Sequence, residues 1–310
     1  MSENGQDDES RATDEFRCGY VGIIGRPNVG KSTLLNQILG QKISITSRRP
    51  QTTRNRIVGI HTTEQAQAIF VDTPGIHQGG KRAINRYMNR AAKSILNDVD
   101  ILLWVVDAKQ WKEEDEAILT TLKTVETPMM LVLNKIDQLK NKDALLPLIE
   151  RLSKSLAFIA VVPLSARRGT YVDSLLAEVE KALPVNEPVY PEDRVTDRSM
   201  RFIASEIIRE KLTRRLGQEM PYVLAVEIEK FSESAGKAEI NALIWVERNT
   251  QKAIVVGDKG QVLKEVGTQA REDLEKIMEC KVYLELWVKV KEGWSEDVRH
   301  LRNLGYDELE

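Results

Sequence analysis

The stretch Gly25-Arg-Pro-Asn-Val-Gly30-Lys31-Ser32 indicates the fold class, because its glycines, lysine and serine have the spacing of a phosphate-binding loop. The apolar run 20–24 stands directly before it and a helix-like pattern follows, so the loop joins a strand to a helix as this motif requires. A glycine-rich turn without a ligand is the alternative, but such a turn would not need the Lys31-Ser32 pair. The sequence therefore predicts a phosphate site in a P-loop fold.

The chemistry of this loop gives its residues distinct roles. Glycines let successive backbone N–H groups wrap the phosphates, and the N-terminus of the following helix favours their negative charge. We expect Lys31 to place a point charge on the β- and γ-phosphates and Ser32 to offer a hydroxyl to Mg²⁺. Nucleotide binding is assigned to Gly25, Arg26, Pro27, Asn28, Val29, Gly30, Lys31, Ser32 and Thr33.

A second element, Asp72-Thr-Pro-Gly75, follows the apolar run 68–71, and ligands gather at the carboxyl ends of parallel strands. Asp72 is predicted to hold Mg²⁺ through water, and the Gly75 N–H to sense the γ-phosphate. Alone, this tetrapeptide is more often an ordinary turn, so its position after the P-loop carries the assignment. The nucleotide-binding residues predicted here are Asp72, Thr73, Pro74, Gly75 and Ile76.

The third element, Asn134-Lys-Ile-Asp137, indicates which base is bound. A carboxylate at Asp137 accepts both the N1–H and the exocyclic N–H₂ of guanine, a pair of donors that adenine does not offer. The sequence therefore predicts GTP and GDP rather than ATP, although in isolation the motif could be an ordinary polar turn. The loop at 165–166 is expected to close over the guanine. The base-site residues are Asn134, Lys135, Ile136, Asp137, Ser165, Ala166 and Arg167.

Composition limits the protein class more than the function. A chain of 310 residues with 42% hydrophobic content is long enough for about two domains. Only Cys18 and Cys280 are present, too few for a disulfide framework. The formal charge of −2 gives no general sign of nucleic-acid binding. Because no apolar run approaches membrane-spanning length and no signal pattern begins the chain, we expect a cytoplasmic protein.

The chain divides at a cluster of prolines, Pro184, Pro188 and Pro191, which deny regular hydrogen bonding. Before it, apolar runs alternate with amphipathic stretches, which predicts an α/β domain with a mostly parallel sheet covered by helices. After it, the pattern predicts a smaller α+β domain. We expect a disordered acidic tail over 1–16, a P-loop domain over 17–184, a linker over 185–200, a KH-like domain over 201–290 and a C-terminal tail over 291–310.

Within the second domain, Gly257-Asp-Lys259-Gly260 resembles the Gly-x-x-Gly loop of a type II KH domain. The pattern alone is weak, but the expected order of helix, strand, strand, helix, loop, helix and strand supports it. A small α+β module that binds a protein stays the alternative. The basic stretch 209–215 is interpreted as the solvated face of a helix. RNA binding is assigned to Lys252, Gly257, Asp258, Lys259, Gly260 and Lys264.

Three further stretches complete the pattern: Ile43-Ser-Ile-Thr-Ser47, Pro50-Gln-Thr52-Thr53-Arg54 and Lys81-Arg-Ala-Ile-Asn85. With the motifs above, they resemble the Era family of bacterial ribosome-assembly GTPases over nearly the whole range from Cys18 to Tyr306. The resemblance implies binding to small-subunit ribosomal RNA near its 3′ end and assistance to 30S assembly. We further expect a monomer, and leave open a peripheral association with the inner face of the cell membrane. The alternative is a GTP-dependent switch whose second domain binds a protein or membrane partner.

The resemblance also places the first switch loop at Thr53, with Thr52 as a close alternative. The Mg²⁺ ligands are then Ser32, Thr53 and Asp72. Ile76 stands where Ras-like GTPases have the glutamine that orients water. Either hydrolysis is slow, or Asn28 is the P-loop ligand of a K⁺ ion, as in related GTPases. The residues assigned to catalysis are Lys31, Thr53, Gly75 and Asn28.

Overall fold

The computed structural model describes residues 15–47, 53–74, 95–216, 220, 224–234, 236–297 and 301. Several predicted features lie outside these residues. They are the alternative switch threonine Thr52, the γ-phosphate-sensing Gly75, the neighbouring Ile76, residues 1–14 of the N-terminal tail and most of the C-terminal tail.

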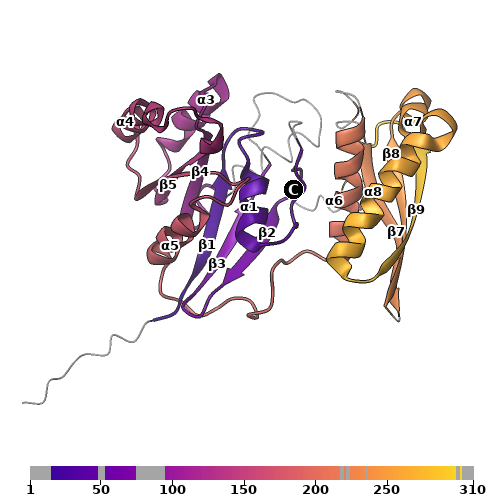
Figure 1. Ribbon diagram of the computed structural model, residues 1–310, viewed down its shortest axis with the longest axis horizontal. Helices are drawn as coiled ribbons and strands as arrows, with labels where there is room; N and C mark the ends of the chain where they lie inside the picture. Colours follow the sequence, from indigo (N-terminus) through magenta and orange to yellow (C-terminus); the bar gives the residue numbers. More distant parts are fainter. Residues whose placement is uncertain are drawn as a thin grey trace, which may run out of the picture.

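The first domain is a six-stranded sheet in the order β2-β3-β1-β4-β5-β6, with helices on both faces (Figure 1). Its strands are β1 (Arg17–Ile24), β2 (Ile57–Thr62), β3 (Ala66–Asp72), β4 (Ile101–Asp107), β5 (Met129–Asn134) and β6 (Ala160–Leu164). All are parallel to their neighbours except β2, which pairs antiparallel with β3. The expected mostly parallel sheet is confirmed, and β2 is an addition that the sequence patterns did not reveal.

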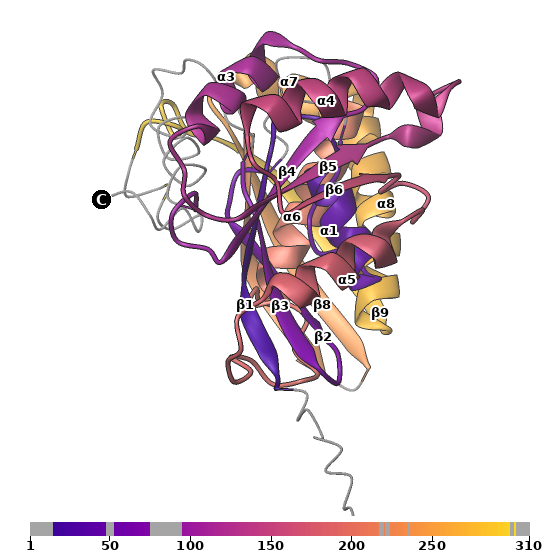
Figure 2. The same cartoon turned by 90° about the vertical axis from the view of Figure 1, so that its left-hand side faces the viewer.

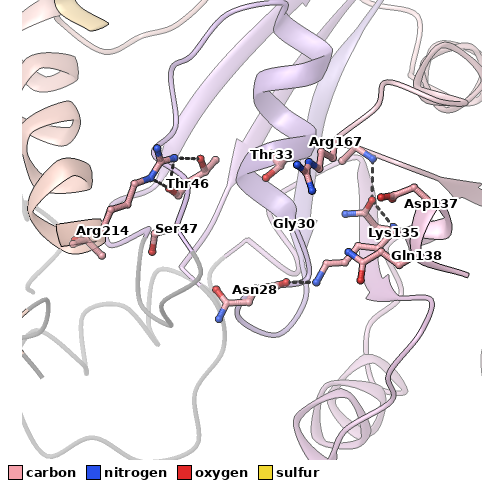
Figure 3. A pocket seen from close by; sticks show the side chains of 13 residues that line it. Asn28, Gly30, Thr33, Thr46, Ser47, Lys135, Asp137, Gln138, Arg167 and Arg214 are labelled. Atoms are coloured by element: carbon pink, nitrogen blue, oxygen red, sulfur yellow. Dashed lines mark hydrogen bonds between the residues drawn. The ribbon is translucent and has the colours of Figure 1, made fainter. Parts of the chain in front are cut away.

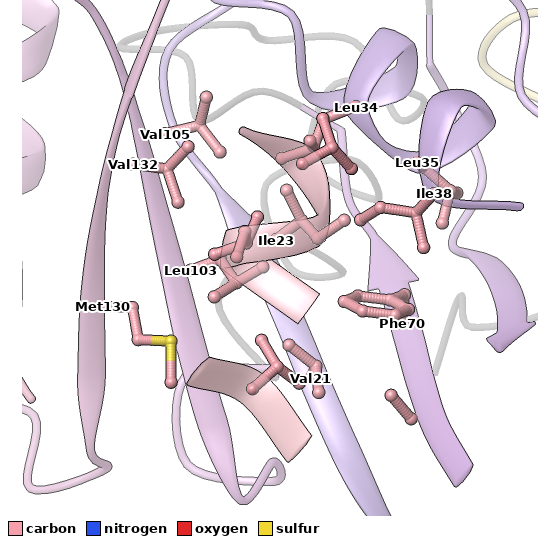
Figure 4. Close-up of a cluster of buried hydrophobic side chains, with 14 of the residues drawn as sticks. Val21, Ile23, Leu34, Leu35, Ile38, Phe70, Leu103, Val105, Met130 and Val132 are labelled. Atoms are coloured by element: carbon pink, nitrogen blue, oxygen red, sulfur yellow. The ribbon is translucent and has the colours of Figure 1, made fainter. Parts of the chain in front are cut away.

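Helices cover the sheet because its central strands are apolar on both faces. The α-helices in the described part of this domain are α1 (Lys31–Leu39), α3 (Glu113–Leu122), α4 (Leu146–Ser155) and α5 (Val172–Ala182). Alternate residues of β1 point to opposite layers: Ile23 packs in the layer under α1 and α5, whereas Ile24 packs in the layer under α3 and α4. Figure 4 shows Leu34, Leu35 and Ile38 of α1 over the first of these layers.

The segment between the two domains is fixed to the sheet of the first domain. Residues 183–199 contain no helix or strand, only isolated bridges of Val185 to Arg17 and of Thr196 to Gly59. The buried side chain of Gln67 on β3 accepts from the backbone N–H groups of Val189 and Tyr190, at 2.8 and 2.9 Å. This segment is therefore positioned by hydrogen bonds although it lacks regular structure.

The second domain is a three-stranded sheet, β7-β8-β9, with helices packed against it. In chain order its elements are α6 (Met200–Arg215), β7 (Leu224–Ser234), β8 (Lys237–Val246), α7 (Asn249–Val256), the short helix η4 (Asp258–Gly260), α8 (Gln261–Met278) and β9 (Lys281–Val290). β7 and β8 are antiparallel, and β8 and β9 are parallel. This is the predicted order of elements, so the expected KH-like α+β fold is confirmed.

Helix α6 lies between the sheet of the second domain and the first domain, as the two views agree (Figures 1 and 2). Its charged residues Glu206, Arg209, Glu210 and Lys211 are all buried. The prediction of a solvated helix face over 209–215 was therefore wrong for most of this stretch. The physical reason is that α6 is covered from two sides, and its buried charges are paired with one another, with Lys42 of the first domain and with Asp273 of α8.

Candidate nucleotide site and RNA-binding loop

The phosphate loop has a backbone that demands its glycines. Gly25 and Gly30 have φ of 149° and 105°, values that side chains rarely adopt. A Cβ on Gly25 would lie 2.4 Å from the Val105 carbonyl oxygen, and one on Gly30 would lie 2.3 Å from Nδ2 of Asn134. Both glycines thus allow the loop to pass close to the ends of neighbouring strands just before α1.

Lys31 places a buried positive charge inside this loop. Its Nζ donates to the carbonyl oxygens of Gly25 and Arg26 at 2.8 and 3.1 Å, and the residue is 6% exposed. Burial lowers the pKa of Lys31 to about 8, although the nearby Asp72 carboxylate opposes this shift. A desolvated ammonium bonded only to neutral carbonyls favours an anionic ligand, which is the role predicted for Lys31.

The three predicted Mg²⁺ ligands come together at the end of β3. Ser32 Oγ lies 2.9 Å from Thr53 Oγ1 and donates to Asp72 Oδ2 at 2.7 Å. Ser44, which the sequence analysis did not assign, donates to the same carboxylate oxygen at 3.1 Å. Burial raises the pKa of Asp72, with Lys31 and the two serine hydroxyls opposing it.

This set of oxygens fits a hard divalent cation. Asp72 Oδ1 is buried and has no hydrogen-bond partner within the described part of the chain, so it offers an unused acceptor. Mg²⁺ binds few protein ligands and keeps waters and substrate phosphates for the rest of its octahedron. Accordingly, the described residues include no group of three or more His, Cys, Asp or Glu side chains that could hold a metal by themselves.

Asn134 joins the base site to the phosphate loop. At the end of β5 its Nδ2 donates to the Val29 carbonyl at 2.8 Å, and its Oδ1 accepts from the Ala166 N–H at 3.0 Å. Ser165 Oγ donates to Asp137 Oδ1 at 2.7 Å and so orients the carboxylate predicted to read guanine. Three loops that are far apart in the sequence are thereby held around one opening.

Lys135 links the base loop to the phosphate loop and to the end of β4. Its Nζ donates to the Asn28 carbonyl at 2.6 Å and pairs with Asp107 Oδ2 at 2.8 Å. Lys135 itself has a left-handed backbone, with φ of 71°. Asp107, at the end of β4, is a supporting residue that sequence reasoning missed, because its partner is distant in the chain.

These loops surround a pocket of about 1010 Å³ (Figure 3). The predicted residues that line it are Asn28, Gly30, Thr33, Asn134, Lys135, Asp137, Ala166 and Arg167. Residues that line it without having been predicted are Thr46, Ser47, Gln138, Thr213 and Arg214. Thr46 and Ser47 belong to a stretch already noted for its family resemblance, whereas no sequence signal connected the second-domain residues Thr213 and Arg214 with a nucleotide.

Other predicted residues do not line the pocket but pack beside the loops that form it. Val29 and Ile136 are buried in the hydrophobic layers on either face of the sheet. The Arg26 side chain is also buried and pairs with Asp115 of α3, with Nε 2.8 Å from Oδ2. Thr73 donates from Oγ1 to the Ile23 carbonyl at 3.1 Å. Nucleotide contacts of these residues stay a prediction.

We expect Asn134→Ala to raise the dissociation constant for GDP about 30-fold, because two buried hydrogen bonds are lost and the Val29 carbonyl and Ala166 N–H lose their partner. Isothermal titration with GDP measures the change, and thermal unfolding without nucleotide checks that the variant is folded. Asn141→Ala is the matched control, since Asn141 caps the short helix η2 (Lys142–Leu145) and is not part of the pocket lining. An unchanged affinity in a folded Asn134 variant would contradict the proposed linkage of the loops.

The Gly-x-x-Gly loop of the second domain also has positive φ angles at both of its glycines. Gly257 has φ of 74°, and a Cβ there would lie 2.4 Å from Cγ2 of Val262. Gly260 has φ of 80°, but a Cβ there would meet nothing within 4 Å. The first glycine is thus required by packing, whereas the second leaves an open path beside the loop.

Positive charge surrounds this path. Lys259 lies in the loop, with Lys252 on α7 and Lys264 on α8, and all three are exposed. The start of α8 adds a helix N-terminus at Gly260, which favours negative charge. The arrangement is chemically suited to a nucleic-acid backbone passing the loop.

The fold and the sites define a P-loop GTPase joined to a KH domain. A family model described as 50S ribosome-binding GTPase matches residues 20–135, and a KH domain model matches residues 219–295. The GTPase Era of Histophilus somni (strain 2336) is 56% identical over 299 residues, covering 96% of this chain and 98% of that protein. The GTPase Era of Pseudomonas fluorescens (strain Pf0-1) is 51% identical over 297 residues, covering 96% and 99%. The chain belongs to the GTPase Era family.

Two solved structures agree with this assignment. One is a variant of Aquifex aeolicus Era bound to GDP and AlF₄⁻, and the other is Era in complex with MgGDPNP and nucleotides 1506–1542 of 16S ribosomal RNA. Each is 40% identical to this chain, has a TM-score of 0.90, and covers 94% of this chain and 99% of its own. Within the described residues, no helix is both long and apolar enough to cross a membrane.

Proposed function

We propose that this protein is a GTP-binding and GTP-hydrolysing switch that binds small-subunit ribosomal RNA near its 3′ end and assists assembly of the 30S subunit. The observation that carries the proposal is the likeness, at a TM-score of 0.90 over 94% of this chain, to an Era structure that holds MgGDPNP and a 16S ribosomal RNA fragment. The exposed, lysine-surrounded loop at 257–260 supports the RNA part. We place the protein in the cytoplasm as a monomer.

In this proposal GTP occupies the pocket between the phosphate loop and the base loop. Lys31 and the loop N–H groups bind the phosphates, and Asp137 selects guanine. Ser32, Thr53 and Asp72 would hold Mg²⁺. The Ser32 hydroxyl already lies within hydrogen-bond distance of both the Thr53 hydroxyl and the Asp72 carboxylate. When bound, Mg²⁺ neutralises charge on the phosphate oxygens of the nucleotide.

Asn28 is proposed to bind K⁺ beside the phosphates. It lines the pocket with a left-handed backbone, φ of 65°, and its carbonyl is engaged by Lys135, while its side-chain amide points away from that lysine (Figure 3). A monovalent cation there would stabilise charge that develops on the phosphates.

We therefore expect single-turnover GTP hydrolysis to be about 10-fold faster in K⁺ than in Na⁺ at equal ionic strength, and Asn28→Ala to remove the difference. Asn141→Ala, an asparagine replacement outside the pocket lining, should keep it. Equal rates in the two salts would leave the alternative of a slow enzyme whose switch is set by nucleotide exchange and by partners.

The RNA proposal is tested by filter binding of the full chain to the 3′-terminal segment of 16S ribosomal RNA at rising salt. Loaded with GTP analogue or with GDP, the protein should bind with steep salt dependence, and the two affinities should differ by about 5- to 150-fold, as is usual for coupled sites. Absence of binding in both states favours the alternative in which the second domain binds a protein. Sedimentation with anionic vesicles tests the membrane alternative in the same buffers.

A further inference from the structure

Helix α6 carries buried charges that face the first domain. The side chain of Glu210 is fully buried, and its Oε2 lies 2.8 Å from Nζ of Lys42, which stands just after α1. Lys42 Nζ also lies 2.8 Å from Asp273 Oδ2 on α8, and Lys211 Nζ lies 2.5 Å from the same oxygen. A buried carboxylate without its partner is strongly destabilising, so Lys42 of the first domain is part of what holds the two domains together.

The charges of this cluster reinforce one another. Burial acts to raise the pKa of Asp273, but the bonds from Lys211 and Lys42 outweigh it, and the pKa lies below its usual range. The carboxylate is therefore ionised at neutral pH and available to both lysines. The cluster is an interdomain contact built from charges of opposite sign.

The same helix reaches the wall of the nucleotide pocket through Arg214. The guanidinium donates to the Thr46 carbonyl from Nε at 3.1 Å and from Nη2 at 2.9 Å, and Nη2 also lies 3.1 Å from Thr46 Oγ1. Arg214 pairs in addition with Glu210, the carboxylate held by Lys42. Figure 3 shows Arg214 extending from α6 to Thr46, on the side of the pocket opposite Lys135 and Asp137.

A second contact fixes the region near the predicted metal ligands. Arg54 follows Thr53, whose hydroxyl lies 2.9 Å from Ser32 Oγ. The side chain of Arg54 is buried and donates from Nη1 to the Leu224 carbonyl at the start of β7, at 2.8 Å. Two described segments of the first domain that border the nucleotide site are thus each bonded to the second domain.

We propose that Arg214 is a positioning residue for the bound nucleotide: it holds Thr46 at the pocket wall, so that docking of the second domain slows nucleotide release. The inference rests on the nucleotide occupying the pocket described above. To the extent that docking also raises the equilibrium affinity for the nucleotide, linkage is reciprocal, and bound nucleotide stabilises the docked arrangement by that same affinity factor. The second domain is then a structural part of the nucleotide site as well as the carrier of the RNA-binding loop.

The test is the release of tritiated GDP from the full chain, chased by excess unlabelled GDP. Arg214→Ala should raise the release rate about 5-fold, a moderate effect because the side chain is 48% exposed. Arg214→Lys should restore part of the slow release, since an ammonium can still donate to the Thr46 carbonyl. Arg215→Ala is the matched control: Arg215 is equally exposed but pairs with Glu265 of α8, and its release rate should equal that of the unaltered chain.

A double-mutant cycle separates positioning from a general loss of stability. Thr46→Val removes one acceptor of the Arg214 contact, so its effect should not add to that of Arg214→Ala. Lys42→Met, which loosens the docking from the first domain, should also speed release. Additive effects, or an Arg214 variant with lowered thermal stability but unchanged release, overturn the inference.

Asp137→Asn in the same assay distinguishes a wrongly placed nucleotide from a wrong role for Arg214. If it speeds GDP release while Arg214→Ala does not, the pocket is correct and the positioning role of Arg214 is wrong. If neither variant changes release, the nucleotide does not occupy this pocket, and the inference fails together with the site.

Discussion

Asp137→Asn is expected to invert the base preference of this protein from guanosine to xanthosine triphosphate. In the proposed site the Asp137 carboxylate accepts from two guanine donors, whereas an amide would accept from only one of them and would oppose its own N–H₂ to the other. Xanthine presents a carbonyl where guanine has its amino group, so the amide then finds a partner. A site that leaves buried polar groups unpaired rejects a ligand by about 10⁴-fold, which sets the expected size of the change in GTP-to-XTP preference.

This substitution should leave the neighbouring hydrogen bond intact. Ser165 Oγ bonds Asp137 Oδ1 at 2.7 Å, and an asparagine can keep that acceptor with its own amide oxygen. Competition titrations of GTP against XTP measure the preference. Asp143→Asn, the same change of charge at an exposed position of η2, should leave it untouched. Guanine preference retained by the Asp137 variant would move the base site elsewhere in the molecule.

Lys259→Asp is expected to weaken binding to 16S ribosomal RNA by about 100-fold, because it replaces attraction to phosphates with repulsion at the loop proposed to bind the RNA backbone. Lys259 has φ of 47°, and aspartate is among the few residues that tolerate this left-handed conformation. The loop should therefore keep its shape while its charge is reversed. Replacing Asp258 and Lys259 together should abolish RNA binding.

Two controls make the result specific to the loop. Lys281→Asp makes the same charge reversal beyond the far end of α8, an 18-residue helix that spans about 27 Å, and should reduce RNA affinity only slightly. GTP affinity measured without RNA should be unchanged in both variants. If the loop variant and the unaltered chain bind RNA equally, the second domain does not use this loop, and a protein partner becomes the better proposal.

Local sequence patterns were enough to predict the phosphate loop, the order of elements and the class of the second domain. The P-loop could be recognised because its function depends on consecutive backbone conformations, and glycine at positions 25 and 30 is dictated by local φ and by close contacts. The KH-like order of elements could be recognised because apolar periodicity reports which face of each element is buried. These are local properties, and a linear pattern records them.

The distant residues that complete the sites could be identified only from the folded structure. Asn134 ties the phosphate loop to the base loop, and Arg214 brings a helix of the second domain to Thr46, although 168 positions separate those two residues. The basic stretch 209–215 has the pattern of a solvated helix face, and it is buried because another domain covers it. Charges are paired by where the chain folds, not by their spacing along it, so the sequence could predict the nucleotide chemistry but not the second-domain side of its pocket.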